Sequence, residues 1–265
     1  MNTSEKLIKT AQYAQETVEL NNQLEQILYG TDTGGKSFYD EFWDGFQLEG
    51  KRNNFTSNYM NVFAFMNSSA FYPKYDIKVN TNATNMFYNF NNQGSESPID
   101  LVERLEKCGV SLDFSKATVL SLAFGSAKIT RLGIIDLSSA TNLDRTFYGM
   151  LHIKKIEKVI VNESHKFVTN AGYHTFYNLP KLEEITFEGV IASNINMACS
   201  EVLTKESIIN IINVLSSTAN GLTLTLYKTA VNNAFEISEG LGNGTTSQEW
   251  LNLIATKSNW TISLV

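Results

Sequence analysis

Short apolar stretches recur along the chain at a nearly constant interval. Residues 110–124 align with residues 133–147 at an offset of 23 positions, and Asp, Ser, Ala, Thr, Leu and Phe recur at matching places. In each unit a hydrophobic–polar–hydrophobic stretch is followed by a buried-type aromatic residue. One such unit cannot bury its apolar strand face alone, so the pattern predicts neighbouring units that stack against each other.

Related units extend the pattern in both directions. Asp76 precedes Phe87 by the same interval of eleven residues that separates Asp113 from Phe124 and Asp136 from Phe147. Further strands are expected at residues 159–161, 185–187 and 222–227, with Phe176 and Met197 as buried residues of their units. Periods of about 20–29 residues with this pattern are typical of leucine-rich repeats. The sequence therefore predicts an α+β fold, a leucine-rich-repeat-like solenoid with one continuous parallel sheet of short strands and helical caps.

Two helices, one loop and a final strand complete the expected repeat region. Residues 98–108 predict an amphipathic helix, with Pro98 near its first turn and Gly109 just past its end. Residues 164–174 predict a polar loop that lengthens one repeat. Residues 204–215 predict a helix with a strongly apolar face that closes the solenoid before the last strands, and residues 260–265 predict a final strand.

The N-terminal part divides into a helix and an aromatic segment. Residues 4–29 predict one helix, and its apolar positions suit a short coiled coil, docking on another protein, or packing on the helix's own domain. The positions that would form an oligomerisation seam are Leu7, Ala11, Ala14, Val18 and Leu28. We expect three parts: residues 1–30 as the helix, 31–72 as linker and aromatic-rich cap, and 73–265 as the solenoid. The aromatic cluster of residues 38–72 is interpreted as a cap over the first repeat, with a ligand platform as the alternative.

A glycine-rich segment between the helix and the aromatic cluster gives the sharpest enzymatic hypothesis. Residues 30–37, from Gly30 to Ser37, match the phosphate-binding pattern G-x-x-x-x-G-K-[ST]. A phosphate loop needs a buried strand before it, whereas residues 23–29 read as the end of an amphipathic helix. A nucleotide-binding protein is therefore only a remote alternative, and no catalytic residue is assigned.

Charge and composition narrow the class of partner. The net charge of −6 disfavours nucleic acid and anionic membrane surfaces, and the lysines Lys154, Lys155 and Lys158 make a local patch best explained as a solvated face. The N-terminal residues lack the pattern of a secretory signal, and no apolar run reaches the about 20 residues that span a bilayer. We expect no membrane insertion.

Cysteines and histidines do not suggest a metal or redox site. Cys108 and Cys199 are interpreted as small core residues, and neither has a partner at metal-ligand spacing. The histidines His152, His165 and His174 are widely spaced and are interpreted as surface residues. No metal and no cofactor are expected.

The outward strand positions are the candidate binding residues. On each strand one residue lies between two buried ones, and together these residues would form a line along the exposed sheet face. The line consists of Asp76, Asp113, Asp136, Ile160 and Thr186. It is acidic at one end and suits a basic or polyhydroxylated ligand, although a solvated sheet face accounts for any single member.

Four segments carry a resemblance to a known family: residues 39–46 (YDEFWDGF), 73–77 (PKYDI), 105–115 (LEKCGVSLDFS), and 230–235 (AVNNAF) near Trp260. They resemble the BspA-type leucine-rich-repeat family, most closely the subgroup encoded in phages and prophages of Gram-positive gut-type bacteria. The resemblance covers roughly residues 38–265 and leaves out the N-terminal helix. It carries over no catalytic residues, because the family has no shared active site.

The resemblance implies a non-enzymatic protein-binding module, a phage tail or virion-associated protein that recognises a host surface or another virion protein. Its ligand would be a protein or a cell-surface glycan, and its N-terminal helix would form a homo-oligomer or dock on the particle. The expected location is the virion, or the host cytoplasm before assembly. The alternative is an adhesin-like bacterial protein that reaches the cell surface without a signal peptide, but secreted adhesins of this family carry export signals and wall anchors that we do not find.

Overall fold

The computed structural model describes residues 62–73, 76–92, 97–170, 174–238 and 247–265. Contacts divide the chain into two units, Met1–Arg52 and Asn53–Val265, and every described residue belongs to the second. The predicted N-terminal helix, its apolar seam and the glycine-rich segment of residues 30–37 therefore lie outside the described residues.

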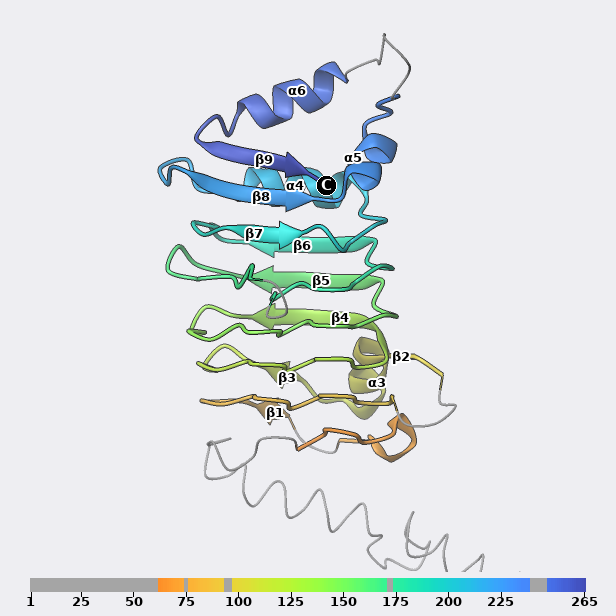
Figure 1. The fold of residues 1–265 in the computed structure, drawn as a ribbon. Helices are drawn as coiled ribbons and strands as arrows, with labels where there is room; N and C mark the ends of the chain where they lie inside the picture. The colour runs from red at the N-terminus through yellow and green to blue at the C-terminus, as the bar shows by residue number, and fades with distance from the viewer. Residues whose placement is uncertain (1–61, 74–75, 93–96, 171–173, 239–246) are drawn as a thin grey trace, which may run out of the picture. The chain divides into compact units, whose positions relative to one another are not determined.

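The strands form three separate sheets, and every strand pair in them is parallel (Figure 1). Strands β1 (Ile77–Lys78) and β3 (Leu112–Asp113) make a two-stranded sheet. A four-stranded sheet has the order β2 (Ile99–Asp100), β4 (Ile129–Asp136), β5 (Lys155–Ile160), β6 (Glu184–Glu188), and a three-stranded sheet the order β7 (Ile195–Met197), β8 (Leu222–Leu226), β9 (Trp260–Leu264). Mixed helices and parallel sheets confirm the α+β class.

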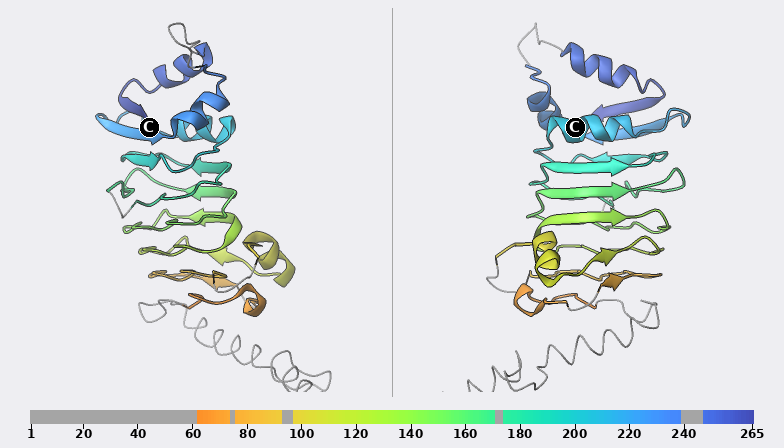
Figure 2. Two further views of the ribbon diagram at one scale, coloured as in Figure 1. Left: turned by 45° about the vertical axis from the view of Figure 1, so that its right-hand side comes forward. Right: turned by 180° about the vertical axis from the view of Figure 1, so that it is seen from behind.

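The prediction of one continuous sheet is wrong at both ends of the four-stranded sheet. The strands predicted near residues 135, 160 and 186 do lie side by side, as β4, β5 and β6 (Figure 2). The strand near residue 112 pairs with β1 instead. The reason is the inserted segment of residues 97–109, which places β2 and a helix beside the first half of β4.

The 23-residue interval is visible in the backbone pairing behind the strands. Asn82, Val119 and Asn142 form consecutive parallel bridges, and Val119 and Asn142 are one interval apart. The following turns also repeat, because Asn85, Leu122 and Arg145 all adopt positive φ angles between 51° and 55°. Equivalent residues of successive units thus share one backbone conformation.

A column of phenylalanine rings fills the core. Phe87, Phe124, Phe147 and Phe176 stack with centroid separations of 5.4, 5.8 and 5.2 Å and interplanar angles of 13° or less. Each ring is at most 2% exposed, and the same is true of Met197 in the next unit. The apolar residue predicted for each unit is therefore buried.

The end of the aromatic segment packs against this column. Phe63 and Phe71 are fully buried, and their rings contact Phe87 at 5.0 and 5.8 Å. Backbone bonds from Phe63 to Met86 and from Phe65 to Tyr88 continue the stacking of units. These described residues behave as a cover over the first repeat, whereas residues 31–61 of the predicted cap lie outside the described residues.

The inserted helix of residues 101–108 has capping residues at both ends. The short 3-10 helix η2 spans Ser68–Ala70, and helix α3 spans Leu101–Cys108. The Asp100 side chain accepts a hydrogen bond from the Glu103 N–H at 2.9 Å, and Gly109 ends α3 with a φ of 66°, a conformation that costs glycine little. The helix starts later than predicted, because Ile99 and Asp100 pair with β4.

The C-terminal part contains three further helices, α4 (Lys205–Asn213), α5 (Lys228–Ala234) and α6 (Gln248–Ala255). Helix α4 matches the predicted closing helix, and Thr204 caps its first turn. Helices α5 and α6 were not predicted. The Phe235 ring just after α5 packs on Trp250 of α6 at 5.1 Å.

Candidate functional site

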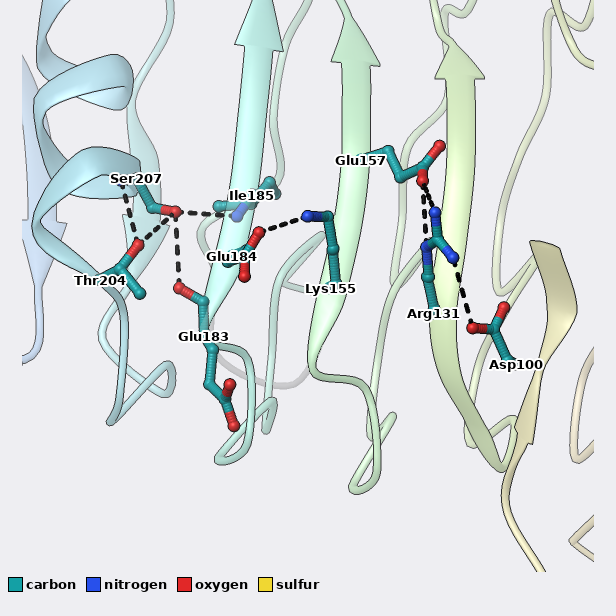
Figure 3. Close-up of polar contacts among 9 residues, drawn as sticks. All are labelled: Asp100, Arg131, Lys155, Glu157, Glu183, Glu184, Ile185, Thr204 and Ser207. Atoms are coloured by element: carbon teal, nitrogen blue, oxygen red, sulfur yellow. Dashed lines mark hydrogen bonds and ion pairs between the residues drawn. The ribbon is translucent and has the colours of Figure 1, made fainter. Parts of the chain in front are cut away.

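The outer face of the four-stranded sheet carries a row of charged side chains (Figure 3). On β6 buried and exposed residues alternate, whereas on β4 and β5 two less buried residues stand between successive buried ones. The charged residues of the three strands are thus among the less buried positions and meet on the outer face. Arg131 on β4 lies between two carboxylates. It bonds Glu157 on β5 through two guanidinium nitrogens and lies 3.6 Å from Asp100 on β2.

Glu157 has the largest effect on the pKa of Arg131 and Asp100 a smaller one, and both raise it. Arg131 therefore keeps its positive charge. A planar guanidinium between two carboxylates is held more firmly than a single flexible pair. Arg131 therefore ties three strands together across the outer face.

Lysines of β5 meet glutamates of β6 in the same way. Lys155 pairs with Glu184 and Lys158 with Glu188, each at 2.5 Å. In the preceding loops Lys154 approaches Glu183 at 3.7 Å. The lysines interpreted as a solvated patch are thus members of cross-strand ion pairs. Such exposed pairs stabilise the fold by roughly 0–1 kcal/mol each, so their charges can exchange partners at little cost.

The predicted acidic row is used mostly for local structure. The Asp113 carboxylate accepts a hydrogen bond from the Ser115 N–H, and Asp136 accepts one from the Ser138 N–H, each at 2.8 Å. Both bonds close a turn directly after a strand. Asp76 accepts bonds from the backbone and the hydroxyl of Ser111, and these bonds lower its pKa.

The register brings only part of the predicted row together. Asp136 lies opposite Ile160, and Ile160 lies opposite Glu188, not Thr186. A register shift between Ile156 and Val159 accounts for the difference, because it adds one residue to β5 relative to β6. Thr186 is exposed on β6 but outside this row. Likewise Asp113 lies opposite Lys78, so Asp76 is offset from it by two residues.

An apolar cleft adjoins the charged face where α3 approaches β4. Its volume is about 240 Å³, and its wall includes Val102 and Leu105 of α3, Leu112 of β3 and Ile134 of β4. Ile134 is 53% exposed, which is unusual for a large apolar side chain on a strand. We did not predict this cleft, and the only signal in the sequence was an isoleucine at an outward strand position.

One histidine differs from the prediction. His165 is 2% exposed, and its Nδ1 accepts a hydrogen bond from the Asn162 N–H at 2.8 Å. Burial lowers the pKa of His165, against the opposing effects of the Leu137 backbone and Asp136. Burial also lowers the pKa of the half-buried His152 and His174.

Cys108 and Cys199 are free thiols and half-buried, so they are less deeply placed than predicted.

The described part of the chain holds no group of three or more histidine, cysteine, aspartate or glutamate side chains placed to bind a metal ion. None of its helices combines the length and apolar character needed to cross a bilayer. No protein-family model, curated protein or solved structure matches the chain significantly.

Proposed function

We propose that this chain is a leucine-rich-repeat-like solenoid that acts as a non-enzymatic binding module. Its role would be that of a phage or prophage tail-associated protein that recognises a host surface or another virion protein. The observation that carries the proposal is the outer face of β4, β5 and β6. This face presents charged side chains over a core of buried apolar residues.

The geometry suits recognition because the charged groups are pre-organised. Neighbouring strands lie about 4.8 Å apart, so the ion pairs across β4, β5 and β6 lie close together on one face. A polar or charged partner could replace the internal pairs one by one, because each contributes little to folding. Exposed charges at the edge of an interface affect the association rate and its salt dependence more than the affinity.

The N-terminal helix would supply the second element of the function. We propose that its seam, formed by Leu7, Ala11, Ala14, Val18 and Leu28, joins several chains or docks them on a particle. Held together in this way, weak individual sites gain avidity, by a factor of about 100 to 10,000 where the geometry allows simultaneous contact. The single sheet face therefore does not need a high affinity.

Charge reversal on the sheet face tests this proposal. The full chain is incubated with cell walls of Gram-positive gut bacteria and the bound fraction is measured over a range of salt concentrations. We expect the double variant Lys155→Glu, Lys158→Glu to bind about tenfold more weakly, and the native protein to lose binding as salt rises.

The matched control is the double variant Lys116→Glu, Lys166→Glu. It changes the net charge equally at exposed positions outside the strands. Equal losses in both double variants would mean that net charge, not the sheet face, governs binding. If the native chain bound none of the cell walls and no tail protein of the same particle, the proposed function would be wrong.

A further inference from the structure

The apolar cleft lies between β3 and β4, two successive strands that do not pair with each other. After β1, β4 and β5, the residue that follows the strand donates its N–H to the carbonyl of the last residue of the neighbouring strand at 2.9 Å. The donors and acceptors are Val79 to Asp113, Leu137 to Ile160 and Val161 to Glu188. The equivalent bond from Phe114 to Asp136 is missing, although the structure describes both residues, and no ladder joins β3 to β4. The inserted helix α3 stands beside this opening, so the cleft is a consequence of the insertion.

The wall of the cleft is apolar and its only charged members are acidic. Val102, Leu105, Val110 and Leu112 line it on the side of α3 and β3, and Ile134 lines it on β4. The two charged residues that line it are Glu106 and Glu157.

Gly133 leaves the space open. A Cβ atom at this position would lie 3.5 Å from Val102 Cγ2 and 3.8 Å from Glu157 Oε2, so any larger side chain would project into the cleft. Glu157 Oε1 accepts the hydrogen bonds from Arg131, whereas Glu157 Oε2 is the carboxylate oxygen that a Cβ at Gly133 would approach. A carboxylate oxygen is therefore available beside the apolar wall.

We infer that this cleft is a docking site for a short segment of a partner protein, in which a branched aliphatic side chain stands next to a lysine or arginine. The inference rests on the proposed function and places its anchor point on the same outer face. An apolar cavity of about 150 Å³ holds benzene, and drug-sized ligands need about 300–1,000 Å³, so a volume of about 240 Å³ fits a side chain.

The negative charge of Glu106 and Glu157 favours a cationic residue next to the aliphatic side chain of the partner. Glu106 and Glu157 would each offer a carboxylate to a cation beside the buried aliphatic group. An aliphatic anchor inside an apolar pocket with ionic contacts at its rim is the usual arrangement of a binding hot spot. An acidic partner segment would instead meet like charge.

Three capped pentapeptides test the inference on the full-length protein by NMR. The probe is N-acetyl-Gly-Lys-Leu-Lys-Gly-amide, and the matched peptides replace Leu with Ser or both Lys residues with Glu. We expect the probe to shift the backbone amide signals of Gly133 and Ile134 saturably, with a Kd of about 1 mM. Both matched peptides should bind at least about tenfold more weakly.

Two glutamates of α3 provide a matched pair of variants. Glu106→Gln should weaken probe binding several-fold, whereas Glu103→Gln should not, because Glu103 pairs with Lys107 and does not line the cleft. Gly133→Val should abolish binding by filling the cleft, with an unchanged far-UV circular dichroism spectrum.

Several outcomes would overturn the inference. They are the absence of saturable shifts at Gly133 and Ile134, equal binding of the serine or glutamate peptide, and equal effects of the two glutamine variants. Shifts at these amides that depend on protein concentration without peptide would assign the cleft to a second copy of the chain. Cell-wall binding by the native protein together with a negative peptide result would refute the cleft alone, whereas the reverse pattern would refute the proposed function alone.

Discussion

At the scale of single residues, short polar side chains at the strand ends shape the backbone. Asp113, Asp136 and Asn162 each accept a hydrogen bond from the N–H two residues later, and Asn142 and Asn196 do the same in the return segments. Aspartate and asparagine favour such turns because they satisfy the backbone locally. The repeated acidic residues of the sequence are therefore explained first as turn formers, and only second as ligands.

His165 is the residue that should make stability depend on pH near neutrality. Its folded-state pKa is lowered by burial, so between that value and the unfolded value of about 6.5 the unfolded chain binds more protons. The free energy of unfolding should therefore fall as the pH falls through about 6.5, and level off below the folded-state pKa. Urea denaturation at pH values between 7.5 and 5, values chosen around the histidine pKa, measures this dependence.

The variant His165→Asn should lose much of this pH dependence, because an asparagine oxygen can accept the Asn162 N–H bond without titrating. His152→Asn, at a half-buried position, should change it less. An unchanged pH dependence in His165→Asn would show that burial of this imidazole does not control acid stability.

At the scale of elements, α4 covers the edge of the four-stranded sheet that β6 forms. The Ser207 hydroxyl accepts the Ile185 N–H at 3.0 Å, and the Asn210 side chain both accepts the Phe187 N–H and donates to the Phe187 carbonyl. Two side chains of one helix thus stand in for the next strand (Figure 3 shows the Ser207 contact). Covering an edge in this way prevents pairing with another chain.

The variant Asn210→Ala tests this role of α4. It leaves a backbone N–H and a carbonyl of Phe187 without their partners, so the free energy of unfolding should fall by about 1–3 kcal/mol. The matched control is Asn213→Ala at an exposed position of the same helix, where we expect a change within about 0.5 kcal/mol. Chemical denaturation gives both values, and a similar small effect in the two variants would contradict the edge-covering role.

At the scale of the whole described unit, the phenylalanine column couples one turn of the chain to the next. Phe147 stacks between Phe124 and Phe176 and is fully buried. In stacked architectures stability comes from contacts between neighbouring units, so a defect in the middle weakens both sides. We therefore expect the stability of the successive units to depend on this column of rings.

Phe147→Ala should lower the free energy of unfolding by about 3–5 kcal/mol, because it opens a cavity that the neighbouring rings cannot fill. The control Leu151→Ala removes an apolar side chain that is 46% exposed in the same unit, and should cost much less. Far-UV circular dichroism in urea measures both. Equal losses would mean that the column does not couple the turns.

Elements with a local cause could be predicted from the sequence alone. The recurring apolar stretches predicted the strands at β4, β5 and β6, and the 23-residue offset predicted equivalent places for Phe124 and Phe147, which are both buried. The apolar face of residues 204–215 predicted α4 closely, and Pro98 and Gly109 predicted α3 within a few residues.

The grouping of the strands and the side chains that face the solvent depend on contacts between distant segments. The break between β3 and β4 depends on where the inserted helix packs, and the one-residue shift that aligns Ile160 with Glu188 depends on the pairing of β5 with β6. The ion pairs of Lys155 and Lys158 join residues 29 and 30 positions apart, a distance over which no local pattern acts. Periodicity specifies which side of a strand is buried, whereas contacts between distant segments determine register, edges and clefts.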